Sequence, residues 1–176
     1  MASEFPTSSD DDQPDVIDWM RAEWVERQDS AELEFVTTMA LLRTHQWVVR
    51  AMDQELRSLR LSRNAYLILT SLQLSEGRTR PLGKLSKYLM VHPTTVSMAV
   101  EQLVKAGLVE RRAHTTDRRT VLATLTPAGM KVVEEANNRL AGGRFGLDSV
   151  DAETLEALIE QLQLVRRAVG DVETGH

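Results

Sequence analysis

The sequence predicts a mostly α-helical fold with one small β-hairpin. Over most of the 176 residues, apolar side chains recur every three or four positions, as in helices that bury one face. Residues 108–112 and 120–125 instead have the composition of short strands. Two short helical patterns joined by a turn come directly before these strands. Two helices, a turn and a hairpin in this order predict a winged helix-turn-helix.

The N-terminal part combines a charged tail with two helices. Residues 1–15 contain five acidic side chains and no basic one, and we expect them to form a disordered tail. Helices are expected over residues 16–27 and 31–59. Ser62 has the side chain of a helix N-cap, so a third helix should begin there and end near Gly77.

Residues 81–91 and 93–107 are the two helices of the predicted helix-turn-helix. In the turn between them, His92 can cap the second helix and Pro93 can occupy its first position. Val96, Val100 and Leu103 are spaced to face inward. The second helix is therefore the one expected to enter a major groove of DNA, with the hairpin as the wing.

Two more helices are expected after the hairpin. Thr126 is a candidate N-cap, with Pro127 at the first helical position, for a helix that extends to about residue 140. The last helix is expected over residues 151–169. We predict four segments: an acidic tail (1–15), N-terminal helices (16–60), a winged helix-turn-helix (61–130) and C-terminal helices (131–176).

The charge of the chain is unevenly distributed. Residues 78–131 contain ten Lys/Arg and three Asp/Glu, a net charge of +7, whereas the rest contains 11 basic and 23 acidic residues, a net charge of −12. A basic segment within an acidic protein is typical of a module that binds a polyanion. A solvated charged surface without a partner would have the same composition.

Several functional classes are disfavoured by the composition. The chain has no cysteine, which fits a reducing cytoplasm and excludes disulfides and cysteine ligands. It has no signal peptide pattern and no apolar run long enough to span a membrane. Its four histidines lack metal-site spacing, and no catalytic motif is present. We therefore expect a cytoplasmic protein that is not an enzyme and has no metal or cofactor.

The segment DRRTVLATLTPAG (117–129) resembles the wing motif of the MarR (multiple antibiotic resistance regulator) family, D-x-R-x-x-x-apolar-x-L-T-x-x-G. VEQLVKAGLVERR (100–112) is similar to the end of the family's recognition helix and the strand that follows. With the flanking helices, the resemblance covers roughly residues 31–170. The residues that match the wing motif in register are Asp117, Arg119, Leu125, Thr126 and Gly129.

This resemblance implies a homodimer whose N- and C-terminal helices are dimerisation helices, and a transcriptional regulator, commonly a repressor relieved by a small, often aromatic, ligand. It implies that Arg119 enters a minor groove and that Asp117 orients its guanidinium. The residues expected to face the major groove are Thr94, Thr95, Ser97 and Met98. Further DNA contacts are expected from Lys84, Lys87, Arg111, Arg112 and Arg118.

Met98 departs from the family pattern, in which Arg or Asn often occupies its position. The helix over residues 93–107 has one base, Lys105, so we expect no bidentate arginine–guanine contact from it. Threonine methyls and Met98 could instead contact thymine methyls. The base-poor helix leaves an alternative open, namely a winged-helix ligand-sensing or protein-interaction module without specific DNA binding.

A ligand site is predicted less sharply than the DNA surface. The family's ligand crevice lies between its dimerisation and DNA-binding regions, and the side chains expected near it are His45, Trp47 and Met52. Trp24 lies in an extra helix that contributes to a urate pocket in some members. Leu67 occupies the position of that pocket's acidic residue, so urate is disfavoured. Trp24 could equally serve to pack the extra helix.

The last helix has an apolar stripe with alternating spacings of three and four. The five positions are Leu155, Leu158, Leu162, Val165 and Val169. A narrow stripe of this kind is typical of a helix that packs against another helix. The sequence therefore predicts a homodimeric regulator that binds a pseudo-palindromic operator in double-stranded DNA.

Overall fold

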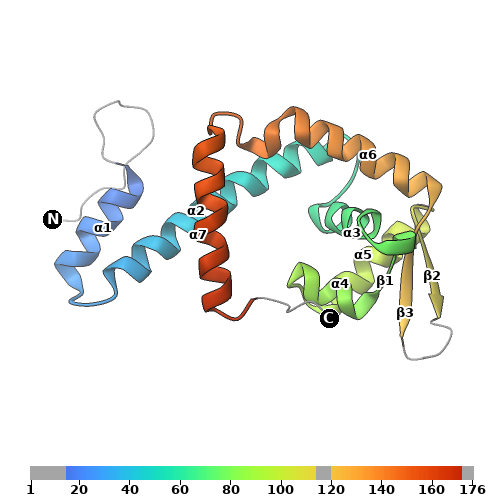
Figure 1. The fold of residues 1–176 in the computed structure, drawn as a ribbon, viewed down its shortest axis with the longest axis horizontal. Coiled ribbons are helices and arrows are strands. Elements are labelled where there is room, and N and C mark those ends of the chain that lie inside the picture. The colour runs from blue at the N-terminus through green and yellow to red at the C-terminus, as the bar shows by residue number, and fades with distance from the viewer. Residues whose placement is uncertain (1–14, 114–119, 172–176) are drawn as a thin grey trace. The chain divides into compact units, whose positions relative to one another are not determined.

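The computed structural model describes residues 15–113 and 120–171. Its helices and strands are, in order, α1 (Val16–Arg27), α2 (Glu32–Arg57), α3 (Arg63–Gln73), β1 (Thr79–Pro81), α4 (Leu82–Leu89), α5 (Pro93–Lys105), β2 (Val109–Ala113), β3 (Val121–Leu125), α6 (Pro127–Gly142) and α7 (Ala152–Ala168), with short 3-10 turns at Glu76–Arg78 and Arg144–Gly146 (Figure 1). This mostly helical fold with a small antiparallel sheet confirms the predicted winged helix-turn-helix. The acidic tail predicted over residues 1–15 lies, apart from Asp15, outside the described residues.

The chain divides into two compact units, Met1–Arg50 and Ala51–His176. In the first unit, α1 folds back on the beginning of α2. The ring of Trp24 stacks on Phe35, with 4.0 Å between ring centroids, and its Nε1 donates to the carbonyl oxygen of Ser30 at 3.0 Å. Arg21 and Glu32 form an ion pair at 2.6 Å. Trp24 therefore has a structural role in attaching α1, which has no buried residue of its own.

The hydrophobic core lies in the second unit and combines helices with the sheet. Its fully buried side chains include Leu56, Ile68, Leu69, Leu72, Leu85, Val96, Val100, Val109, Val133 and Leu140. Removing each such aliphatic side chain from water contributes about 1.5–3 kcal/mol before entropy costs. The Tyr66 hydroxyl donates to Asn137 Oδ1 at 3.0 Å, and Asn137 Nδ2 donates to Gln73 Oε1 at 2.8 Å. These bonds fix α3 against α6.

The helix-turn-helix has the caps that the sequence predicts. Pro93 begins α5, and the Nδ1 atom of His92 accepts from the Thr94 N–H at 3.3 Å. Met90 ends α4 earlier than expected because it adopts a left-handed conformation with φ +51°. The hydroxyl of Ser86 donates to the Val91 carbonyl oxygen at 2.9 Å. Hydrogen bonds between neighbouring residues thus hold the turn, and the hydroxyl of Ser86 is one of the groups that form them.

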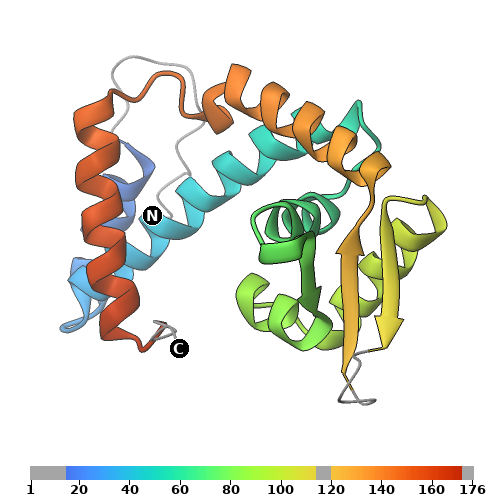
Figure 2. The same ribbon diagram turned by 45° about the vertical axis from the view of Figure 1, so that its right-hand side comes forward.

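The sheet contains one strand more than the predicted hairpin. β2 and β3 pair from Val109↔Leu125 to Ala113↔Val121, and β1 joins the other edge of β3, so the order is β1-β3-β2. Figure 2 shows the two longer strands side by side and β3 leading into α6. The helix expected to end near Gly77 ends at Gln73, because the backbone of Ser75 is extended (φ −91°, ψ 149°), and the 3-10 turn Glu76–Arg78 then leads into β1.

Thr126 and Gly129 join the base of the wing to α6. The Thr126 hydroxyl donates to the Gly107 carbonyl oxygen at 2.8 Å and accepts from the Gly129 N–H at 2.9 Å. A Cβ atom on Gly129 would lie 2.1 Å from the Leu108 carbonyl oxygen and 2.7 Å from the Leu125 side chain. Glycine is therefore required here for close packing of α6 on the segment between α5 and β2.

We predict that Gly129→Ala lowers the free energy of unfolding by about 1–3 kcal/mol, because the added methyl group overlaps backbone atoms. Gly142→Ala is the matched control. Gly142 lies in the same helix as Gly129, and a Cβ atom added there would meet nothing within 4 Å. Its effect should be neutral or stabilising by up to about 1 kcal/mol. Denaturant unfolding at one fixed protein concentration measures both, and equal effects would contradict this account.

Candidate nucleic-acid interface

The outer face of α5 is polar except for one methionine. Val96, Val100 and Leu103 are buried, as the spacing predicts. Thr95 and Ser97 are half-buried at the border of the exposed face. After the exposed Pro93 at its start, the exposed side chains of α5 are Thr94, Met98, Glu101, Gln102 and Lys105. The side chain of Met98 is 60% exposed, and it is the large apolar residue of this face.

Gln102 is an interface candidate that the sequence reasoning missed. It is exposed and lies one helical turn after Met98, on the face that includes Thr94. The signal was present in the sequence, because positions 94, 98, 102 and 105 share one face of a helix with 3.6 residues per turn. Glutamine can form two hydrogen bonds with adenine in the major groove.

Two charges on α5 neutralise each other. Lys105 Nζ lies 2.9 Å from Glu101 Oε1, and both side chains are more than half exposed. The hydrogen bond and the positive charge of Lys105 lower the pKa of Glu101, and the charge of Arg111 adds to the effect. The carboxyl group of Glu101 is therefore ionised at neutral pH. The single base of α5 is thus already paired before any DNA is present.

Among the described residues, the basic side chains without an ion-pair partner near this surface lie beside α5 rather than on it. A surface hollow of about 620 Å³ is lined by residues from β1, α4, α5, β2 and the start of β3. Three of its lining side chains, Lys84, Lys87 and Arg111, are basic, and Ser97 joins them from α5. Three cations at one concavity make a suitable site for phosphate groups.

Arg112 does not belong to this hollow. Successive side chains of a strand point to opposite faces, so Arg111 and Arg112 diverge along β2. Arg112 forms an ion pair with Glu110, which lies two positions away on its own face. The two arginines were predicted as equivalent phosphate contacts, and the structure places only Arg111 beside the α4 lysines.

The three wing-tip residues Asp117, Arg118 and Arg119 lie outside the described residues, so their predicted roles stay predictions. The described part of the wing ends at the pair Ala113↔Val121. Arg80, from the edge strand β1, lies 5.3 Å from the ring centroid of Tyr88 and contacts Ser75. This arginine therefore packs against α4.

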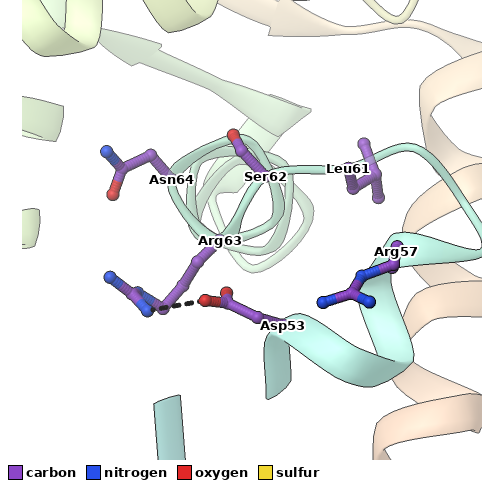
Figure 3. Close-up of a pocket in the computed structure, with 6 residues that line it drawn as sticks. All are labelled: Asp53, Arg57, Leu61, Ser62, Arg63 and Asn64. Carbon is purple, nitrogen blue, oxygen red and sulfur yellow. Dashed lines mark hydrogen bonds and ion pairs between the residues drawn. The ribbon is translucent and has the colours of Figure 1, made fainter. Parts of the chain in front are cut away.

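The four ligand-site candidates are not gathered into one described pocket. His45 and Trp47 are exposed on α2, Met52 packs against the core of the second unit, and Trp24 stacks on Phe35. A different hollow, of about 380 Å³, lies where α2 leads into α3. Figure 3 shows its lining, in which Arg63 and Asp53 pair at 3.4 Å and Arg57 lies nearby. None of the four candidates lines this hollow.

Among residues 15–113 and 120–171, no group of three or more His, Cys, Asp or Glu side chains could hold a metal ion. None of the helices described has the length and apolar content needed to cross a membrane.

The fold and this surface define the class of protein: a winged helix-turn-helix, DNA-binding transcription regulator. The MarR family model matches residues 61–121. An uncharacterised HTH-type transcriptional regulator of Bacillus subtilis, YdgG, is 30% identical over 129 residues, covering 72% of this chain and 83% of YdgG. The chain belongs to the MarR family. Members of this family regulate transcription, which fits the prediction of a protein that is not an enzyme.

Solved structures agree with this assignment. Sco5413, a MarR family transcriptional regulator from Streptomyces coelicolor, is 32% identical with a TM-score of 0.73, covering 80% of this chain and 97% of Sco5413. Sco3205, a MarR family transcriptional regulator from the same organism solved in complex with DNA, is 24% identical with a TM-score of 0.70. The match covers 80% of this chain and 90% of the Sco3205 chain. The second likeness shows the fold alone.

We predict that Lys87→Ala weakens binding to specific and random duplexes alike, because a phosphate contact carries no sequence information. The slope of log affinity against log salt should fall by about one unit. Arg112→Ala is the matched control, since Glu110 already pairs with Arg112 away from the hollow. Fluorescence anisotropy over a salt series measures both variants. A larger slope change for Arg112→Ala than for Lys87→Ala would contradict the assignment.

Proposed function

We propose that this protein is a homodimeric repressor that binds a pseudo-palindromic operator and is released by a small aromatic ligand. The observation that carries the DNA-binding part is the juxtaposition of the exposed α5 face with the cations of the neighbouring hollow. The helix is suited to contact base edges, and Lys84, Lys87 and Arg111 are suited to hold the phosphates that flank it.

The apolar surface of α7 supports the dimer. This helix has no buried residue within its own chain, although Leu155 and Leu162 are half-buried. Its exposed large apolar side chains are Leu158, Ile159, Leu164 and Val165, with Val169 just after the helix. Ile159 lies beside the predicted stripe, whereas Leu164, two positions after Leu162, lies on the other side of the helix. Contiguous apolar surface of this kind marks a protein–protein contact, and a second copy of the chain is the occupant we propose.

The ligand-release part rests on the resemblance and on two exposed groups. Trp47 is 66% exposed on α2, and His45 is exposed two positions before it. An exposed tryptophan offers a flat apolar surface that an aromatic ligand could cover. Met52 and Trp24 remain the further candidates, the latter with a structural role in α1 as well.

DNase footprinting on the promoter next to the protein's own gene tests the proposed function. A dimer with two recognition helices should protect two half-sites whose centres lie about 10 base pairs apart and are related by two-fold symmetry. Absence of any preference over random duplex would favour the alternative, a winged-helix ligand-sensing or protein-interaction module. The paired Glu101–Lys105 charges on α5 are the observation that favours this alternative.

We predict that Leu158→Glu converts the protein to a monomer or an aggregate, because a charge in the proposed dimer contact cannot be solvated. Leu162→Glu should act in the same way. Leu74→Glu is the matched control, because Leu74 is 72% exposed outside α7 and should tolerate the charge. Sedimentation at micromolar concentration separates the outcomes, and a folded monomer of the unaltered chain would overturn the dimer.

We predict that Arg119→Ala weakens operator binding by about 1–3 kcal/mol and reduces the preference for A·T-rich flanks, by loss of a minor-groove contact. The motif resemblance supports this role. The competing role for Asp117 and Arg119 is to stabilise the hairpin turn. Thermal melting separates the two roles. An unchanged affinity with a clear fall in Tm would assign Arg119 to the stability of the wing.

A further inference from the structure

Met98 and Gln102 lie at the centre of the outer face of α5. The cations suited to phosphate are on α4 and β2, which leaves α5 itself for base edges. A single exposed apolar side chain is normal on a protein surface. Met98, however, lies four residues after Thr94 and four before Gln102, which are both exposed. It therefore lies in the middle of the exposed face of α5, within reach of a base if this helix enters a major groove.

The chemistry of this face disfavours bidentate guanine recognition. That recognition uses Arg or Lys on guanine O6 and N7, and the one base of α5, Lys105, is bonded to Glu101 at 2.9 Å. The same ion pair occupies the carboxylate of Glu101, which could otherwise accept a hydrogen bond from the N4 amino group of cytosine. The groups left on the face are a thioether, a carboxamide and hydroxyl groups.

These groups match the A·T base pair. The C5-methyl group of thymine is the apolar group of the major groove, and a flexible, polarisable methionine can pack against it. The carboxamide of glutamine can bond adenine N6 and N7 together. Side chains four residues apart on a helix have Cβ atoms about 6 Å apart, so both can reach one base pair or two adjacent ones.

We propose that Met98 and Gln102 recognise A·T base pairs, with Met98 on the thymine C5-methyl group and Gln102 on adenine N6 and N7. The proposal rests on the proposed function, because it needs DNA bound to α5. α5 then selects A·T base pairs through the major groove, in addition to the A·T-rich flanks expected for the wing.

Base analogues in a selected operator test the proposal with the unaltered protein. The operator is first obtained by selection from random duplexes, and each thymine is then replaced by uracil, which lacks the methyl group. At one or two thymines of each half-site, affinity should fall about three- to fivefold, the factor expected for one buried methyl group. Replacing the contacted adenine by 7-deazaadenine should cost about two- to tenfold, as for one lost hydrogen bond.

Protein variants then assign the contacts. Met98→Ala should abolish the uracil effect at its thymine and retain the 7-deazaadenine effect, and Gln102→Ala should do the reverse. Lys87→Ala is the control, since it should weaken binding to every duplex and leave both factors unchanged. Met98 and Gln102 are exposed, so neither variant removes a core contact.

Two results overturn the proposal in distinguishable ways. If the selected operator binds equally well with uracil at every thymine, or if Met98→Ala keeps the full uracil factor, the proposal is wrong and the proposed function stands. If selection yields no preferred duplex, the proposed function fails and this proposal fails with it.

Discussion

The arrangement of the DNA-binding unit depends on the junction at Thr126 and Gly129. One hydroxyl group joins the end of α5 to the beginning of α6, since it donates to the Gly107 carbonyl oxygen and accepts from the Gly129 N–H. The missing side chain of Gly129 lets α6 approach Leu108. The wing starts and ends at this junction. Its position relative to α5 is therefore held by these two bonds together with the packing of Val109 and Leu125 in the core.

The same junction explains why the LTPAG part of the wing motif has its sequence. Thr126 caps α6, and Pro127 occupies the first helical position, where no N–H is needed. These residues have structural roles, whereas Lys84, Lys87 and Arg111 surround a hollow and have no comparable packing role. The residues that build this junction are thus different from the cations proposed to contact DNA.

Local chemistry accounts for what the sequence predicted well. The bounds of α1, the His92–Pro93 start of α5 and the Thr126 cap all depend on neighbouring residues. β1 was missed because three residues ending in proline form a strand only by pairing with β3, more than 40 positions away. The separation of Arg111 from Arg112 depends on the strand face, which composition alone does not reveal.

The surface divides recognition between two kinds of chemistry. In the proposed function, the cations on α4 and β2 provide attraction that does not depend on sequence, and α5 presents uncharged groups together with the ion pair between Glu101 and Lys105. Such a helix adds little net charge, so its contribution to binding has to come from fit to base edges. Affinity and specificity are thereby assigned to different side chains.

Hydrogen exchange with and without duplex DNA tests most directly whether this surface binds DNA. The account predicts slower amide exchange on binding in residues 82–113, which contain α4, α5 and β2. Exchange in α1, residues 16–27, should stay unchanged. Protection confined to segments outside residues 82–113 would contradict the account.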